Sequence, residues 1–78
     1  MDEMFMRRCL ELAEQAKEKG NVPVGCVIVL DGEVIAEAEE VVPVELTVTG
    51  HAEVIAVQKA CEKLGTLDLS RCVMVTTA

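Results

Sequence analysis

The dipeptide Asp31-Gly32 is the feature that most constrains how this chain can fold. It separates a Val- and Ile-rich run, Val24 to Leu30, from a second run, Glu33 to Ala38. Asp-Gly between two such runs is a strong signal for a two-residue β-hairpin turn. The first run is too short for a typical helix, so we expect a buried strand there and an antiparallel return strand after the turn.

Helices are predicted before and after this hairpin. The first runs from about Glu3 to Lys19, with Asp2 as its cap, Gly20 as its stop, and an apolar face made of Met6, Cys9, Leu10, Ala13 and Ala16. The second runs from about Ala52 to Leu64 and ends at Gly65, with Val54, Val57, Cys61 and Leu64 on one face. Between hairpin and second helix, Glu39 to Gly50 is a loop or a weak extended segment around Val41 to Val48.

A last strand is expected over Cys72 to Thr77, after a turn at Asp68 to Ser70. The predicted order α-β-β-α-β favours an α/β fold in three layers (α-β-α), with helices packed on a mixed sheet. If the first and last strands pair through a crossover helix, they should be parallel neighbours. The last strand would then have an open hydrophobic edge that can accept another strand.

Composition limits the classes of function. At 78 residues the chain forms one domain, 1–78, and its 51% hydrophobic content excludes a disordered tail. A net charge of −7 argues against a broad nucleic-acid surface, which needs clustered Lys and Arg, and favours a small substrate. The acidic N-terminus is unlike a signal peptide, and the apolar stretch Val22 to Leu30 is too short to span a bilayer. We therefore expect a soluble, cytoplasmic protein with no membrane partner.

The four cysteines show no Cys-x-x-Cys and no other familiar metal spacing. Each lies in an apolar context on a predicted helix or strand. We therefore interpret Cys9, Cys26, Cys61 and Cys72 as free, buried thiols in a reducing compartment.

His51-Ala52-Glu53, where the loop enters the second helix, carries the residue types of a hydrolytic metal site. Histidine is the commonest protein metal ligand, and a carboxylate two residues later could act on a zinc-activated water. Taken alone, however, a His followed by a Glu is more often a capped, solvated helix start.

The order of the motifs favours the metal site over an ordinary helix start. In this order the chain resembles the cytidine deaminase-like superfamily, especially its tRNA adenosine, guanine and cytosine deaminases. The matching pieces are the leading amphipathic helix, Val22-Pro23-Val24-Gly25, the hairpin with Glu33-Val34-Ile35-Ala36, His51-Ala52-Glu53, and Leu67 to Cys72 with the strand up to Thr76-Thr77. The resemblance covers essentially the whole chain. It implies hydrolytic, zinc-dependent deamination of an adenine-, guanine- or cytosine-type base or nucleoside, and hence a role in nucleoside metabolism.

The resemblance also implies roles for particular residues. His51 would be one of three protein ligands of Zn²⁺, and Glu53 would be the catalytic general acid/base. The backbone of Ala52 would help to bind the substrate base, and the stretch Pro23 to Cys26 would wall the pocket.

Three departures from the family pattern matter. In the family, a Glu-Pro-Cys-x-x-Cys segment with two further zinc ligands follows the Thr-Thr strand, whereas the last residue of this chain is Ala78. Many relatives have a base-binding Asn where Glu40 stands, and Asp-Pro-Thr-Ala where Thr47 to Gly50 stand. We interpret Glu40 as a solvated member of the acidic run Glu37 to Glu40. The alternative is that Glu40 lines the pocket and binds an unusual substrate.

The leading hypothesis is therefore the N-terminal half of a zinc-dependent deaminase, a hydrolase that acts on a small-molecule base or nucleoside. We expect these 78 residues alone to be inactive and to bind Zn²⁺ weakly or not at all. The alternatives are a non-catalytic interaction or oligomerisation module, one half of a split deaminase, and a shortened chain. The expected partner is a second copy of the chain, as a homo-oligomer, or a complementing C-terminal half.

Overall fold

A computed structural model describes residues 3–43 and 51–77. The elements are α1 (Glu3–Glu18), β1 (Gly25–Leu30), β2 (Glu33–Glu39), α2 (His51–Leu64) and β3 (Val73–Thr76). This is the predicted order, with boundaries within about a residue of those expected from the sequence. The proposed cap, Asp2, lies outside the described residues. Gly20 and Gly65, which follow the two helices, have φ values of 79° and 67°, as their predicted role as helix stops requires.

The predicted hairpin is confirmed. Asp31 and Gly32 both have positive φ, 51° and 81°, as a type I′ turn requires. β1 and β2 pair antiparallel from Leu30 opposite Glu33 to Gly25 opposite Glu39, with a bulge in the register next to Val29. The bulge leaves the residues from Ala36 onward alternating regularly between the two faces of the sheet, which decides the environment of the residues that follow β2.

The pairing continues beyond the two strands. The amide of Glu40 donates to the carbonyl of Val24 at 2.9 Å, and the amide of Val22 donates to the carbonyl of Val42 at 2.8 Å. An isolated bridge joins Asn21 to Pro43. The beginning of the predicted loop, 40–43, is therefore held in extended form against the entrance to β1. The rest of the predicted extended segment, 44–48, lies outside the described residues.

The predicted parallel pairing of the first and last strands is wrong. The strand order is β2-β1-β3, and β3 pairs with β1 antiparallel, with Cys26 opposite Thr76 and Val29 opposite Val73. The reason is that the crossover helix α2 leaves from β2, which already runs opposite to β1. β3 is consequently parallel to β2, and β1 lies between them. The paired strands among the described residues are all antiparallel, not mixed as expected.

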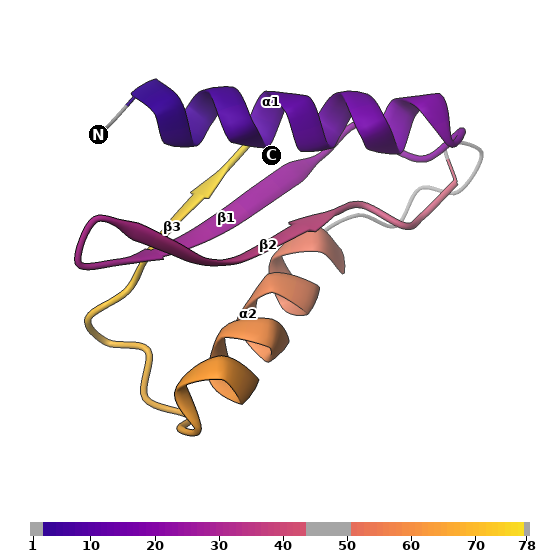
Figure 1. The fold of residues 1–78 in the computed structure, drawn as a ribbon. Coiled ribbons are helices and arrows are strands. Elements are labelled where there is room, and N and C mark those ends of the chain that lie inside the picture. Colours follow the sequence, from indigo (N-terminus) through magenta and orange to yellow (C-terminus); the bar gives the residue numbers. More distant parts are fainter. Residues whose placement is uncertain (1–2, 44–50, 78) are drawn as a thin grey trace.

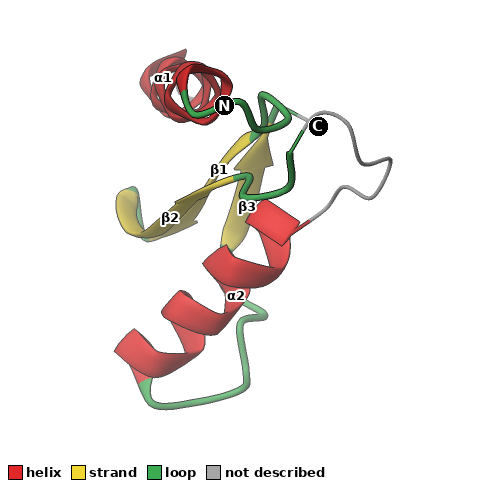
Figure 2. Cartoon of the chain, turned by 90° about the vertical axis from the view of Figure 1, so that its right-hand side faces the viewer, coloured by secondary structure: helices red, strands yellow, loops and turns green. Residues whose placement is uncertain are grey.

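The three layers are as predicted, with α1 and α2 on opposite faces of the sheet (Figures 1 and 2). Alternate residues of β1 serve the two faces: Val27 and Val29 pack with Cys9 of α1, and Cys26 and Ile28 pack with α2. β1 is therefore buried on both sides, which explains its nearly continuous apolar sequence.

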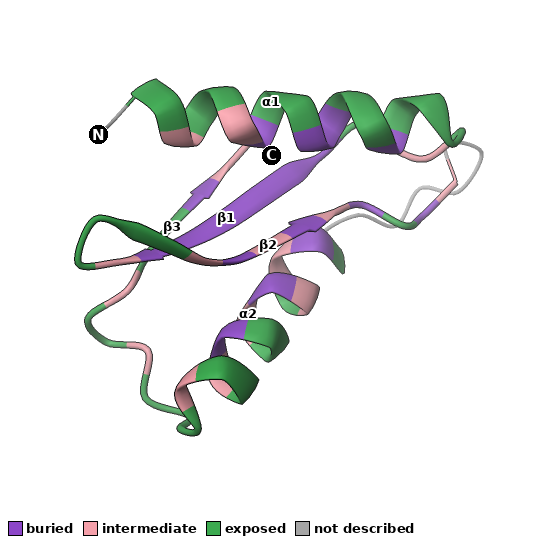
Figure 3. Cartoon of the chain, in the orientation of Figure 1, coloured by how far each residue is buried: buried purple, intermediate pink, exposed green. Residues whose placement is uncertain are grey.

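The buried faces of both helices differ from those predicted (Figure 3). In α1, Cys9, Ala13 and Ala16 are buried as expected, but Leu12 is buried in place of Met6 and Leu10, which are 38% and 57% exposed. In α2 the buried residues are Ala52, Ala56 and Ala60, and the predicted Val54 is 56% exposed. Small side chains let α2 lie close to the sheet, so the most apolar face is not the buried one. Within the described residues, no helix is long and apolar enough to cross a membrane.

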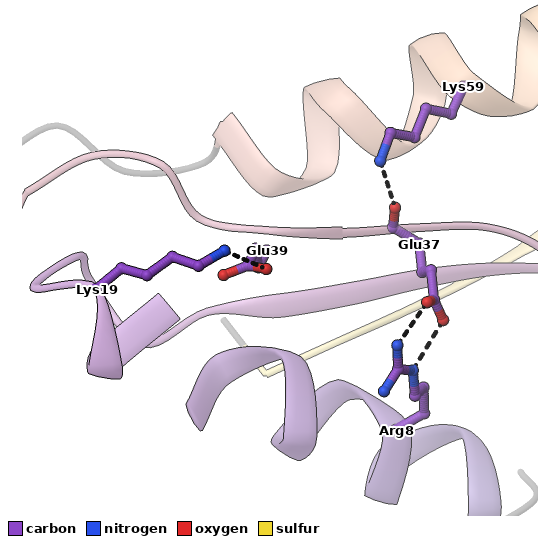
Figure 4. A network of polar contacts seen from close by, with 5 residues as sticks. All are labelled: Arg8, Lys19, Glu37, Glu39 and Lys59. Carbon is purple, nitrogen blue, oxygen red and sulfur yellow. Dashed lines mark hydrogen bonds and ion pairs between the residues drawn. The ribbon is translucent and has the colours of Figure 1, made fainter. Parts of the chain in front are cut away.

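Two ion pairs and one hydrogen bond to a backbone carbonyl connect β2 to the segments on either side of it (Figure 4). Arg8 of α1 donates two hydrogen bonds to the carboxylate of Glu37, at 2.6 and 2.9 Å. These bonds lower the pKa of Glu37, although its partial burial opposes the shift. Lys59 of α2 donates to the carbonyl of Glu37 at 3.1 Å, and Lys19 pairs with Glu39 at 3.1 Å. The strand is thereby linked to both helices.

β3 ends the described sheet, as the predicted open edge requires. Its Val73 and Met74 are 48% and 39% exposed. Thr77 extends the ladder one step further, since its hydroxyl accepts from the amide of Gly25 at 3.0 Å. An edge strand with exposed apolar side chains is a surface that another strand can cover.

The cysteines are free thiols, as predicted. Cys9 and Cys26 are buried, whereas Cys61 and Cys72 are only half-buried.

Candidate functional site

The candidate site forms where the chain leaves β2 and enters α2. Glu40 directly follows β2 and is fixed by the hydrogen bond from its amide to Val24. His51 is the first residue of α2. The Nδ1 atom of His51 lies 3.6 Å from Oε1 of Glu40, with the His51 side chain 46% exposed and that of Glu40 fully buried. The structure thus brings together two residues that are eleven positions apart and that the sequence assigned to different roles.

The interpretation of Glu40 as a solvated residue is wrong. Ala36 and Ala38 are buried against α2, and the period-two alternation of an extended chain places the next such position, Glu40, on the same face. Its Oε1 accepts from the amide of Val41 at 3.2 Å. The signal was present in the sequence, because the small residues at 36 and 38 already mark the inward face of β2.

Ala52 and Glu53 follow His51 in the first turn of α2. Ala52 is fully buried in the cluster that includes Cys26 and Ala56. The start of α2 therefore packs directly against the sheet. Glu53 is partly buried, and its Oε1 is inaccessible and has no hydrogen-bond partner among the described residues. An unpaired buried carboxylate oxygen is costly, and such atoms in native structures commonly mark a ligand or reaction site.

The predicted pocket wall, Pro23 to Cys26, divides between the two faces of the sheet. Val24 and Cys26 belong to the cluster under α2, whereas Pro23 is exposed and Gly25 abuts α1. Burial raises the pKa of Cys26 to about 12, and the negative charge of Glu53 adds to the shift. Cys26 is therefore a neutral thiol at physiological pH, buried in the cluster under α2.

The donors in this region fit zinc in kind, because imidazole nitrogen and carboxylate oxygen are both common zinc ligands. They do not complete a site: no group of three or more His, Cys, Asp and Glu side chains is placed to hold a metal in residues 3–43 and 51–77. A catalytic zinc site needs three protein ligands. The described residues therefore hold no complete set of ligands for such a site.

Two surface pockets lie next to α2. One, of about 300 Å³, is lined by residues between the C-terminal end of α2 and β3, Leu64 to Cys72, together with Leu30. The other, of about 270 Å³, lies between β2 and α2 and includes Glu40 but neither His51 nor Glu53. Neither of these two pockets includes both Glu40 and His51.

An α-β-β-α-β unit in three layers, with His-x-Glu opening the helix that packs under the central strand, places the chain in the deaminase-like class of α/β proteins. The chain belongs to the family described as the cytidine and deoxycytidylate deaminase zinc-binding region, which matches residues 1–78.

Its relatives include two proteins of Bacillus subtilis. The chain is 38% identical over 76 residues to a tRNA-specific adenosine deaminase. The alignment covers 97% of this chain and 47% of that protein. It is 41% identical over 76 residues to a guanine deaminase, covering 96% of this chain and 49% of the relative. The chain thus spans about half the length of these curated relatives.

Solved structures agree with this assignment. The crystal structure of B. subtilis guanine deaminase matches 99% of this chain and 50% of its own, with a TM-score of 0.81 and 38% identity. A structure from a study of tRNA:A34 deaminases matches 95% of this chain and 57% of its own, with a TM-score of 0.77 and 39% identity. Several relatives are named as tRNA deaminases. The expectation that nucleic acid is not a partner therefore has no support from the relatives.

Proposed function

We propose that this chain contributes one part of the active site of a zinc-dependent deaminase that hydrolyses the exocyclic amine of a nucleobase or nucleoside. The observation that carries the proposal is the buried Oε1 of Glu53, which has no hydrogen-bond partner in residues 3–43 and 51–77 and lies two residues from the only histidine of the sequence. A carboxylate oxygen held out of water without a partner is suited to accept and return a proton. The family to which the chain belongs supports zinc as the metal.

In this proposal His51 provides one zinc ligand and Glu53 is the general acid/base. Zinc, when bound, supplies Lewis acidity that makes water a nucleophile near neutral pH. Glu53 would take one proton from the attacking water and deliver it to the ring nitrogen. It would then transfer the second proton, from the hydroxyl group added to the ring carbon, to the amine, which leaves as ammonia. The backbone of Ala52, fixed by burial, would help to hold the base.

The substrate class proposed is a free base or nucleoside carrying an amine on its ring. The net charge of −7 supports a small substrate over a long polyanion, which needs clustered basic side chains. The four free thiols fit a reducing compartment such as the cytoplasm. A tRNA substrate is the alternative that the names of several relatives raise, and assaying free bases, nucleosides and tRNA in parallel separates the two.

A chimera tests the function. The 78-residue chain is joined to the part of B. subtilis guanine deaminase that it does not span, and ammonia release and zinc content are measured for the chimera and for the chain alone. We expect the folded chimera to bind zinc one-to-one and to release ammonia. The chain alone should release none and bind zinc weakly, because the described residues supply fewer than three ligands.

The matched control is the same chimera carrying His51→Ala, which should lose both zinc and activity. Two outcomes would contradict the proposal. One is tight one-to-one zinc in the 78-residue chain alone. The other is a folded, zinc-loaded chimera that releases no ammonia from any of the three substrate classes.

The exposed edge of β3 favours a second function, association with a complementing half or with another copy of the chain. Val73 and Met74 lie half-exposed on an edge strand whose other side is paired with β1. We expect sedimentation of the 78-residue chain to show dimers or larger species that dissociate in the Met74→Lys variant, because a charge on an edge strand opposes pairing. A monomer at high concentration would count against this function.

A further inference from the structure

The sheet formed by the described residues has two edge strands, β2 and β3, whose chemistry differs. β3 has the sequence Val-Met-Val-Thr, with no charged side chain. β2 carries three glutamates among its seven residues, Glu33, Glu37 and Glu39. Native proteins commonly protect an edge strand from pairing with another chain by placing charged side chains on it. The two edges therefore present different surfaces to a further strand.

The backbone of β2 directs alternate residues toward β1 and away from it. The amide of Glu40 donates to the carbonyl of Val24, and Ala38, two positions earlier, is paired with β1 in the same ladder. Glu37 and Glu39 alternate with these residues, so their backbone groups point out of the sheet. The carbonyl oxygen of Glu37 is thus an acceptor that a strand added to this edge would meet.

Lys59 of α2 already binds this oxygen. Its Nζ donates to the carbonyl of Glu37 at 3.1 Å, from a position 22 residues later in the chain (Figure 4). Ala56 and Ala60, on either side of Lys59 in the sequence, are buried against the sheet, so α2 lies close enough for a lysine to reach the edge of β2. An approaching strand would have to displace this ammonium group or strip it of water, and an unpaired buried ammonium is costly.

Ion pairs beside this contact add to the obstacle. The carboxylate of Glu37 accepts two hydrogen bonds from Arg8 of α1, and the carboxylate of Glu39 pairs with Lys19. Since Arg8 belongs to α1 and Lys59 to α2, basic groups reach the β2 edge from both faces of the sheet (Figure 4). An added strand would cover these charges and remove part of their hydration.

The other edge is different. Val75 of β3 is paired with Val27, and the amide of Thr77 donates to the carbonyl of Gly25, so these residues direct their backbone groups toward β1. Met74 alternates with them, and its backbone points away from β1. Its side chain is apolar and 39% exposed. A strand that joins the sheet at β3 therefore meets an uncharged surface.

We propose that Lys59 closes the β2 edge against strand addition, so that the sheet of this chain grows in one direction, at β3. This role is separate from the deaminase chemistry and concerns the opposite edge from the association through β3. A sheet that is open at one edge associates into a closed pair, whereas a sheet open at both edges adds further copies without limit. Lys59 thus limits association of the chain with itself to a dimer.

Sedimentation of the Lys59→Met chain tests this inference. Methionine keeps most of the length of the side chain and removes the ammonium group. We expect species larger than a dimer, with an apparent mass at least about twice that of the unaltered chain at the same concentration. Lys63→Met is the matched control, because it removes the same charge from an exposed position on the same helix, and it should sediment like the unaltered chain.

The same substitution in a Met74→Lys background separates the two edges. Met74→Lys alone should be a monomer, because a charge on β3 opposes pairing there. Adding Lys59→Met should then produce dimers through β2 and about double the apparent mass. A folded double variant that stays monomeric would overturn the inference. Equal association in the Met74→Lys chain that carries Lys63→Met would also overturn it, since the cause would then be net charge.

A second measurement needs no variant at β2. In the unaltered chain, the backbone amide signals of Glu37 and Glu39 in NMR spectra should not change with protein concentration, whereas the amide of Met74 should shift as dimers form. Concentration-dependent shifts at Glu37 and Glu39 would show pairing at β2 and contradict its closure. An unchanged Met74 signal would contradict association through β3 and leave the closure of β2 standing, and neither result bears on ammonia release by the chimera.

Discussion

Replacing Glu53 with Gln is expected to reduce ammonia release by the chimera about 10²- to 10⁴-fold, the range by which a positioned general acid/base accelerates a reaction. Gln has nearly the same shape as Glu but cannot take up or return the proton. Because Oε1 of Glu53 has no hydrogen-bond partner among the described residues, the substitution breaks no described contact of that atom. The loss should therefore appear in kcat, with the fold and zinc content unchanged.

Initial rates of ammonia release, with zinc content and circular dichroism measured on the same samples, provide the test. Glu62→Gln is the matched control, because Glu62 lies exposed near the opposite end of the same helix. That variant should keep full activity. If the Glu53→Gln chimera is folded, loaded with zinc and nearly as active as the parent, Glu53 is not the general acid/base.

Replacing Gly25 with Ala is expected to cost the fold about 3 kcal/mol or more, at or above the upper end of the usual range for overpacking. A Cβ at this position would lie 2.1 Å from the carbonyl oxygen of Cys9 and 2.7 Å from Cβ of Leu12. Both obstacles are at or close to the backbone of α1, so no side-chain rotation can relieve the contact. The helix would have to move away from the central strand, and the cluster of Cys9, Val27 and Val75 would open.

Urea unfolding followed by circular dichroism measures the change. Gly65→Ala is the control, because its Cβ would meet nothing within 4 Å and only the positive φ of 67° opposes it. That variant should lose about 1–2 kcal/mol. If Gly25→Ala were as stable as Gly65→Ala, the close approach of α1 to β1 would be incorrect.

The local part of the fold was predictable because each signal lies within a few residues. Asp31-Gly32 specifies its turn through the φ angles of two adjacent residues, and Gly20 and Gly65 end helices in the same way. Strand pairing is not local. The parallel pairing predicted for β1 and β3 failed because the crossover rule was applied to β1, whereas the strand that enters the crossover is β2.

The helix faces were missed for a related reason. Hydrophobicity ranks Val54 above Ala52, Ala56 and Ala60, but the distance between helix and sheet decides which side chain fits. The sheet face opposite α2 leaves room for alanine, so the larger valine lies outside.

The candidate site was predictable only in part. His51 and Glu53 were identified through a family resemblance, since a His followed by a Glu is by itself an ordinary helix start. Glu40 was misplaced because its acidic neighbours suggested a solvated run. The alternation of Ala36 and Ala38 would have placed it inside. The contact between Glu40 and His51 depends on tertiary structure, and no spacing rule gives it.

The position of β1 between its two partners has a consequence for how the domain assembles. Pairing with β2 closes only a two-residue turn, whereas pairing with β3 closes a loop that contains β2 and all of α2. The entropic cost of loop closure is smaller for the hairpin than for the pairing of β3. We therefore expect the hairpin to form first and β3 to pair later. In the sequence α2 lies between these two steps, and it packs on β1 and β2. The helix that carries His51 and Glu53 can therefore dock on the hairpin before β3 pairs with β1.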